Sequence, residues 1–487
     1  MKRRYGKLST ALIGVLWGLT SLFHFTNPDG RTFAAEQAGE DHIRQGTALE
    51  TNAAELPTRG SVAVPDTAVA QAPDSAASDP FAFGDFTWLN GNDRRHSSVL
   101  DSKMFTGSFM VDVNYNYSFN RPIDHTNVGS TATFREGEVD LSFVGVGGDF
   151  HYDNVRGRLF LQLGTRATGV PRNDFSVYRG QFDLADAYRY ISEAYGGYHW
   201  DVWHGINLDI GIFMSYVGLM SYANVENWSY QPSYTSDNTP WFFHGARLQT
   251  FPSDKLKIEL WLINGWQTYG MFNEEPGMGF QILYRPEESV DIVANGYYGY
   301  DTPVNPNRLR VHSDNSFQLR YRHKPGAFIS KAAFSITGDL GFESGGGVTP
   351  FGGPGGPAQN FIAAMFYHRL WFTDEKFGWT FGGGFMHNPG RYLVLIPTGV
   401  AANTFTENPG DKFDAWDCST TIQYMPSESI TWLLELVHRE ANVPYFAGHG
   451  GVTSPNGFNP PLGDPTGFVP DQVKTETRII FALMVRF

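Results

Sequence analysis

The sequence predicts an all-β protein: a transmembrane, antiparallel, up-and-down β-barrel of about sixteen strands, with short periplasmic turns and long extracellular loops. Three observations lead to this prediction. The last strand has one continuous apolar face, apolar and polar residues alternate along many earlier segments, and the connections between these segments alternate in length. Together these features are typical of bacterial outer-membrane barrels.

The last nine residues carry the clearest of these signals. Apolar residues occupy every second position, at Ile479, Phe481, Leu483, Val485 and Phe487. Successive side chains of a strand point to opposite faces, so this spacing builds one apolar face. We expect this face to contact lipid and the strand to close the barrel, which in this class implies recognition by the barrel-assembly machinery. The alternative is a buried last strand of a soluble sandwich.

The first residues resemble an export signal. Basic residues within positions 2–7 precede an apolar run over 8–23, and a site of small residues follows. This order predicts a secretory signal peptide over residues 1–35, cleaved near Ala34 or Ala35, with an uncleaved anchor as the alternative. No later stretch approaches the ~20 apolar residues of a spanning helix, so we expect a barrel in a Gram-negative-type outer membrane.

Residues 36–80 form a separate region by composition. They are rich in Ala, Asp, Glu, Thr and Pro and contain no Phe, Tyr or Trp. This composition predicts a disordered periplasmic linker, with a partner-binding peptide as the alternative. The barrel domain is then expected to cover residues 81–487.

The overall composition fits a barrel better than a soluble globule. Aromatic residues make up 15% of the 487 residues, and 54 are glycine. A lipid-facing band with aromatic girdles and a polar interior has this composition. The net charge of −14 argues against a nucleic-acid partner, and the single Cys418 excludes an intrachain disulfide.

Alternation at period two predicts the strands. Between Phe109 and Phe119, for example, aromatic and aliphatic residues alternate with Asp, Asn and Ser over about the length that a tilted membrane strand needs. Two segments, 189–199 and 359–372, alternate poorly, which leaves fourteen or eighteen strands as alternatives to sixteen. The sixteen segments are 109–119, 136–148, 155–166, 189–199, 206–215, 242–251, 255–265, 277–285, 288–299, 308–322, 331–343, 359–372, 376–387, 412–425, 429–439 and 474–487.

The connections give an independent test. Every second connection is short, such as 151–153 and 252–254, with 323–330 somewhat longer. Those between them are mostly long, with 300–307 as the exception. Outer-membrane barrels sort their connections in this way, with turns in the periplasm and loops outside. The long connections are 120–134, 167–188, 217–241, 266–276, 344–357, 388–411 and 440–473.

Several short sequence motifs occur in a recognisable order along the chain. They are Trp241-Phe242-Phe243-His244, Trp261-Leu262-Ile263-Asn264-Gly265-Trp266, Asn388-Pro389-Gly390-Arg391-Tyr392-Leu393, Val443-Pro444-Tyr445-Phe446-Ala447-Gly448 and Gly450-Gly451-Val452-Thr453. With the strand pattern, they resemble the β-barrel porins grouped as porin-2, or OmpL-like. The resemblance runs from about Phe81 to Phe487. It implies an outer-membrane pore and supplies neither a solute nor catalytic residues.

Charged residues opposite the apolar stripes are predicted to line the lumen. An Arg or Lys facing lipid at mid-membrane costs roughly 2–4 kcal/mol, which favours the inward orientation. The alternative to a role in ion preference is a set of solvated or paired wall residues. Arg156, Arg158 and Arg166 form the densest basic cluster and give the hypothesis of a preference for anions. The candidates are Asp112, Glu138, Asp140, Arg156, Arg158, Arg166, Asp209, Arg310, Arg320, Glu343, Glu435 and Arg439.

Two long loops, 388–411 and 440–473, are the predicted constriction loops. Loops of this length without secondary structure are commonly functional or disordered. Arg391, Tyr445 and Phe446 are the candidate constriction residues, with an external cap as the alternative for Tyr445 and Phe446.

The predicted function is a porin with a water-filled channel for passive diffusion of small hydrophilic solutes or ions, because sixteen strands leave room for one. The alternatives are a loop-plugged barrel acting as a surface receptor or structural protein and, third, a barrel enzyme.

No His spacing indicates a metal site, and we expect no cofactor and no catalysis. A gated transporter is disfavoured because residues 36–80 are too short and polar to fold as a plug. The sequence leaves homo-oligomerisation open.

Overall fold

The computed structural model describes residues 79–487, apart from 177–179, 272, 303–304, 407 and 455–466. The predicted signal peptide and all but the last two residues of the predicted linker lie outside the described residues. Within the described part of the chain, no helix is long and apolar enough to cross a membrane.

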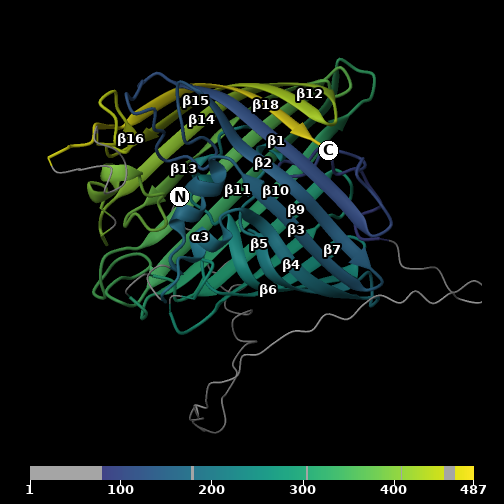
Figure 1. Ribbon diagram of the computed structural model, residues 1–487, viewed down its shortest axis with the longest axis horizontal. Coiled ribbons are helices and arrows are strands. Elements are labelled where there is room, and N and C mark those ends of the chain that lie inside the picture. Colours follow the sequence, from purple (N-terminus) through teal and green to yellow (C-terminus); the bar gives the residue numbers. More distant parts are fainter. Residues whose placement is uncertain (1–78, 177–179, 272, 303–304, 407, 455–466) are drawn as a thin grey trace, which may run out of the picture. The chain divides into compact units, whose positions relative to one another are not determined.

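Sixteen of the described strands form one closed antiparallel barrel (Figure 1). This confirms the predicted fold and strand number, and the two poorly alternating segments are strands β4 and β12. The barrel strands are β1 (Phe105–Ser118), β2 (Val139–Tyr152), β3 (Val155–Leu163), β4 (Ile191–Trp200), β5 (Ile206–Met214), β6 (Phe242–Ser253), β7 (Leu256–Ile263), β8 (Gly277–Tyr284), β9 (Val290–Gly299), β10 (Leu309–His323), β11 (Ile329–Ser344), β12 (Asn360–Phe372), β13 (Phe377–Asn388), β14 (Phe413–Ser427), β15 (Ile430–Ala441) and β18 (Thr475–Arg486).

The strand β18 closes the barrel by pairing with β1, in a register that aligns Met110 with Arg486. Its side chains alternate as the sequence indicates. Phe481 is 46% exposed on the outer face, whereas Ile480 and Ala482 are fully buried on the inner face. The rings of Phe109 and Phe487 lie 6.3 Å apart in a stacked arrangement. Ile479 and Phe487 are exposed like Phe481, and Leu483 and Val485 are half-buried.

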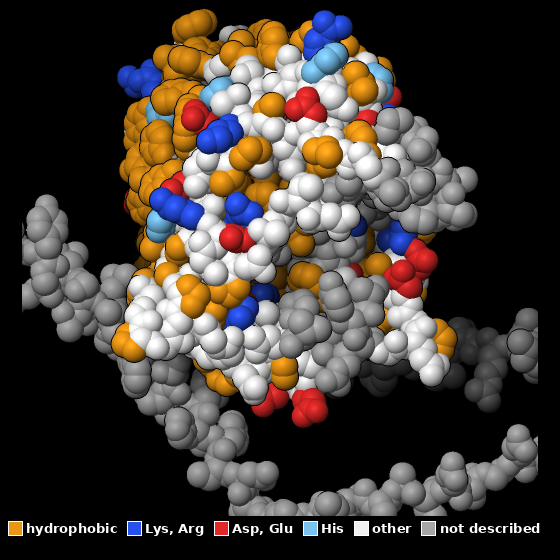
Figure 2. Space-filling view, turned by 90° about the vertical axis from the view of Figure 1, so that its left-hand side faces the viewer, with side chains coloured by type: hydrophobic (Ala, Val, Ile, Leu, Met, Phe, Trp, Pro, Cys, Tyr) orange, Lys and Arg blue, Asp and Glu red, His pale blue; other side chains and the backbone are white. Residues whose placement is uncertain are grey.

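The barrel wall is apolar outside and polar inside. On β14, Trp416, Ile422 and Tyr424 are exposed, whereas Asp417 and Thr421 on the alternate positions are buried. The outer residues are those that contact lipid in a transmembrane barrel. Figure 2 views the molecule from the side on which β16 (Phe446–Ala447) lies in Figure 1, and apolar side chains gather along its left edge.

The ends of the barrel differ as predicted from the connection lengths. Short turns join the strands at one end, and long loops join them at the other.

The first strand begins at Phe105, so residues 81–104, included in the predicted barrel domain, precede the barrel strands. The loops contain α2 (Arg166–Gly169), η1 (Pro171–Asn173), α3 (Leu184–Tyr188), η3 (Asn224–Glu226), α4 (Tyr234–Asp237), η4 (Gly399–Asn403) and the hairpin of β16 with β17 (Gln472–Val473).

Candidate functional site

The connection between β5 and β6, residues 215–241, crosses the lumen, and we call it the inner loop. At its start, the Tyr216 hydroxyl donates to the carbonyl of Gly296 on β9 over 3.0 Å. Further along, the Tyr230 hydroxyl donates to Asp112 on β1 over 2.9 Å. In the ring of sixteen strands, β1 and β9 are eight strands apart in either direction. The inner loop therefore joins opposite walls of the barrel.

Carboxylates on β14 and β15 hold the backbone of the inner loop. Glu435 accepts hydrogen bonds from the backbone N–H groups of Tyr230 and Gln231, at 2.7 and 2.9 Å. Asp417 accepts one from the N–H of Tyr234 at 2.9 Å. Hydrogen bonds to ionised acceptors are about twice as strong as neutral ones. Every residue from 227 to 241 is buried, so the inner loop is part of the filled interior.

The tip of the inner loop is fixed by a buried ion pair. Asp237 lies 2.9 Å from Arg439, and neither side chain is exposed. Burial raises the pKa of the Asp237 carboxyl, while the Arg439 guanidinium acts in the opposite direction. Arg439 also lies over the Tyr234 ring and donates to the carbonyl of Gly129. Because Asp237 also accepts from the N–H of Thr131 at 3.1 Å, three segments meet at this pair.

A second inner element comes from the residues before β1. The Trp88 carbonyl accepts a hydrogen bond from Trp228 Nε1 at 3.2 Å, and Asn90 accepts from the Trp228 N–H at 2.9 Å. The indole N–H of Trp88 donates to the carbonyl of Glu288, in the turn between β8 and β9, at 2.9 Å. Residues 81–95, which we call the N-terminal segment, therefore contact the inner loop at the short-turn end of the barrel.

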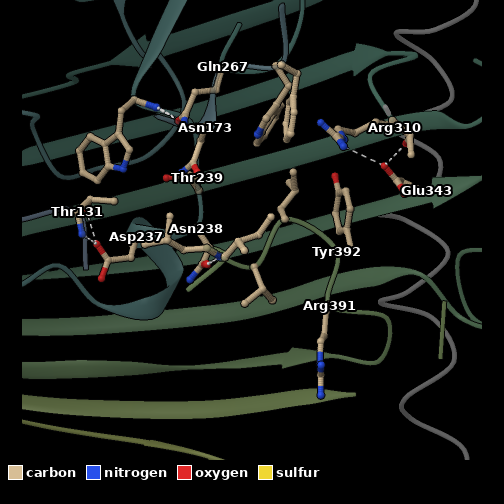
Figure 3. A pocket seen from close by; sticks show the side chains of 18 of the residues that line it. Thr131, Asn173, Asp237, Asn238, Thr239, Gln267, Arg310, Glu343, Arg391 and Tyr392 are labelled. Carbon is tan, nitrogen blue, oxygen red and sulfur yellow. Dashed lines mark hydrogen bonds and ion pairs between the residues drawn. The ribbon is translucent and has the colours of Figure 1, made fainter. Parts of the chain in front are cut away.

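Two cavities lie beside these inner elements. The larger has a volume of about 360 Å³ and the smaller about 180 Å³, and Trp241 lines both. The larger is lined by the inner loop, the loops at the long-loop end and the ends of β10 and β11 (Figure 3). The smaller is lined by residues 214–222, by Gly91 and by Gln281 on β8.

The polar wall of the larger cavity centres on Arg310 and Glu343. These residues face each other across β10 and β11, and their side chains lie 3.0 Å apart. Thr302 donates a hydrogen bond to the same carboxylate at 2.7 Å. The Tyr392 ring lies beside Arg310 in Figure 3, with its centroid 5.3 Å from the guanidinium carbon. This wall can hold a small polar molecule between an ion pair and an aromatic ring.

A family model described as "Putative beta-barrel porin-2, OmpL-like" matches residues 104–487. The chain belongs to this family. The family and the barrel fold support a porin in the outer membrane, and they point to a channel rather than an enzyme. A comparison with curated proteins found no match.

Several solved porin structures are similar to this chain at very low sequence identity. OmpT of Vibrio cholerae, in its trimer form, is 8% identical over 80% of this chain and 100% of its own, with a TM-score of 0.44. The anion-selective porin of Comamonas acidovorans is 8% identical over 79% and 99%, with a TM-score of 0.45. The channel DcaP of Acinetobacter baumannii is 10% identical over 79% and 96%, with a TM-score of 0.43.

Five of the twelve predicted lumen residues of this porin contact the inner elements. Asp112, Glu435, Arg439 and Arg166 bind the inner loop and are at most 5% exposed. Arg320 lies over Trp88 of the N-terminal segment and pairs with Glu288. Only Arg310 and Glu343 among the twelve line either cavity. A role in ion preference stays a prediction for all twelve.

The basic cluster is neutralised within the wall. Arg156 lies 3.2 Å from Asp209, and Arg158 lies between Asp149 and Glu193 at 2.6 and 2.5 Å. Arg166 lies in α2 rather than in a strand, and it donates to the Tyr222 carbonyl and to Asn224. The remaining candidates are the buried Asp140, which accepts from Thr165, and Glu138, which precedes β2 and pairs with Arg135.

The predicted constriction residues lie at the edge of the inner loop, where the ring of Phe446 packs 6.5 Å from that of Tyr234. Tyr445 and Phe446 pack in an apolar cluster with Phe405, and neither lines a cavity. Tyr445 donates to the carbonyl of Leu395 at 2.6 Å, and Leu395 does line the larger cavity. Arg391 also lines this cavity, but its guanidinium lies over Phe405 and points away from Arg310 in Figure 3.

Sequence reasoning missed the inner loop, although a signal was present. Residues 215–241 contain six aromatic residues outside the following strand, and Glu226 and Asp237 are their only charged residues. A solvent-exposed loop rarely has such a composition, since aromatic side chains are usually buried. An aromatic-rich, charge-poor loop in a barrel sequence is therefore a signal for insertion into the lumen.

Proposed function

We propose that this porin lets small hydrophilic solutes diffuse passively across the outer membrane, and that the inner loop sets the width of the path. The observation that supports this most is that Trp241 lines both cavities. In the proposed path, a solute moves from the larger cavity to the smaller one past this side chain. Of the two loops predicted as constrictions from the sequence, 388–411 lines only the larger cavity, and the described residues of 440–473 line neither.

The path is narrow for a barrel of this size. Sixteen strands leave an aqueous channel when the lumen is empty. Here the inner loop crosses from β9 to β1, and the N-terminal segment contacts it at the short-turn end. Solutes of a few heavy atoms to about the size of a monosaccharide fit this arrangement best. We also propose that residues 1–35 direct export as a signal peptide and that residues 36–80 form a periplasmic spacer.

A closed barrel with a structural or receptor role is the second candidate. The contacts of Trp228 with Trp88 and Asn90 favour it, because they join the two inner elements. Gly91 of the N-terminal segment also lines the smaller cavity, so the same contacts favour a path that is closed at the short-turn end.

Single-channel recording in a planar bilayer with asymmetric salt separates the two candidates. Discrete conductance steps from the full chain support the porin, and the reversal potential gives its ion preference in the same experiment. Silence from protein that is folded, as judged by heat-modifiable migration, overturns the channel and favours the closed barrel.

A further inference from the structure

We propose that the larger cavity is a binding site for a neutral, polyhydroxylated solute of about monosaccharide size. The proposal rests on the proposed function, since it names the class of solute that the path would select. The cavity volume of about 360 Å³ lies in the lower part of the range of about 300–1,000 Å³ typical of pockets that bind small molecules.

The polar groups of this site come from neighbouring segments. Arg310 on β10 is paired in register with Glu343 on β11. The N–H of Glu343 donates to the carbonyl of Gln359, just before β12, at 3.0 Å. Arg310, Glu343 and Gln359 therefore lie next to one another on the same wall, and Trp241 lines the cavity from the inner loop.

Three of these side chains have buried polar atoms without a partner among the described residues. They are Nε and Nη1 of Arg310, Oε1 of Gln359 and Nε1 of Trp241. The side chains are only 4–5% exposed, and buried polar groups are nearly always hydrogen-bonded. The set contains donors and an acceptor. A hydroxyl group both donates and accepts, so a molecule with several hydroxyls can satisfy them together.

The charges of the lining argue for a neutral ligand. Every charged residue that lines the cavity has an oppositely charged neighbour among the described residues, so the site offers no unbalanced charge to an ion. The neighbours are Glu343 and Asp301 for Arg310, Glu343 for Arg308, Arg439 for Asp237, and Asp411 for Arg391.

The loop after β13 shapes the remaining side of the site. Tyr392 lies between Arg391 and Leu393, which have φ angles of 54° and 60°. Non-glycine residues adopt such angles at a cost, and they concentrate where a structure imposes a particular geometry. Asn388 accepts a hydrogen bond from the Tyr392 N–H at 2.8 Å, which fixes the turn. The turn holds the Tyr392 ring over Arg310, where an aromatic face can pack against the C–H groups of a sugar.

Calorimetric titration of the detergent-solubilised full chain tests the proposal without requiring conductance. The probes are D-glucose and myo-inositol, with D-gluconate as the charged counterpart. We expect saturable binding of at least one neutral probe and weaker binding of gluconate. Gln359→Leu and Trp241→Phe each remove an unpartnered polar group and leave no protein group unpaired. We expect each to weaken binding about two- to tenfold, the range for one hydrogen bond.

The control is Ser335→Ala, which also removes a buried hydroxyl without a described partner but lies outside both cavities. It should bind as the wild type does. Stronger binding of gluconate, binding that Gln359→Leu and Trp241→Phe leave unchanged, or no binding of any probe would each overturn the proposal. Conductance without binding would contradict only the proposed binding site. Binding without conductance would contradict only the proposed channel.

Discussion

Asp237 and Arg439 form an ion pair of 2.9 Å in which neither side chain is exposed to solvent. The pair joins the tip of the inner loop to β15, two hundred residues further along the chain. Removing one partner of a buried pair leaves an uncompensated charge in the interior, which is strongly destabilising. We therefore expect the position of the inner loop to depend strongly on this contact.

Replacing Arg439 with Met should destabilise the folded barrel or release the inner loop. We expect a loss of about 3–5 kcal/mol in the free energy of unfolding. Urea titration in detergent measures this loss, and hydrogen exchange at residues 227–241 reports a released loop. Adding Asp237→Asn should recover part of the loss, since it removes the unpaired charge.

The matched control for this variant is Arg135→Met. Arg135 pairs with Glu138 in an ion pair whose side chains are 40% and 43% exposed. Solvent-exposed pairs contribute at most about 1 kcal/mol, so the control should lose much less. Equal losses in the two variants would contradict the assignment of Asp237–Arg439 as the main anchor of the inner loop.

The N-terminal segment should detach at low pH. Burial favours a raised pKa for Asp85, but hydrogen bonds from Thr87 and the Lys331 ammonium, 3.2 Å away, bring it down to about 2. Because the folded-state pKa lies below the ordinary 3.8, the carboxylate stabilises the bound segment above pH 3.8. This contribution is lost as the pH falls toward 2.

Pepsin cleavage between pH 4 and pH 2 measures this detachment. Cleavage within residues 81–92 of the wild type should rise across this window. Asp85→Asn should be cleaved readily already at pH 4, with no further change. Asp101→Asn, an exposed carboxylate outside this contact, serves as the control and should follow the wild type. A wild type that stays uncleaved down to pH 2 would show that Asp85 does not hold the segment.

An outward charge on the closing strand should hinder folding into the membrane. Leu483 lies on the outer face of β18, where Arg costs roughly 2–4 kcal/mol at the bilayer midplane. We expect Leu483→Arg to reduce the heat-modifiable, folded fraction, and Leu483→Met to leave it unchanged. Equal folding of the two variants would place this position outside the lipid-facing band.

The barrel was predictable because strand alternation is a local property. In β14, for example, the inward Asp417 and Thr421 and the outward Trp416 and Ile422 can be read directly from their spacing. Even β4 and β12, which alternate poorly, could be placed because the neighbouring turns bound them. The number and order of strands then follow from counting.

The site was less predictable because its contacts join distant parts of the chain. Glu435 binds Tyr230 and Gln231 from more than two hundred residues away, and no spacing rule relates these positions. Inward orientation was predicted for Glu435 and Arg439, but orientation alone does not tell a water-exposed side chain from one covered by a loop. The same limit explains the choice of loops 388–411 and 440–473 over the inner loop.

The most direct test of the account compares the single-channel conductance of Trp241→Ala with that of the wild type in the same bilayer. If Trp241 separates the two cavities along the solute path, the variant should conduct more. Trp379→Ala is the control, because Trp379 is 40% exposed on the outer face of β13 and lines neither cavity. It should conduct as the wild type does. Equal conductance of Trp241→Ala and the wild type would contradict the claim that the inner loop sets the width of the path.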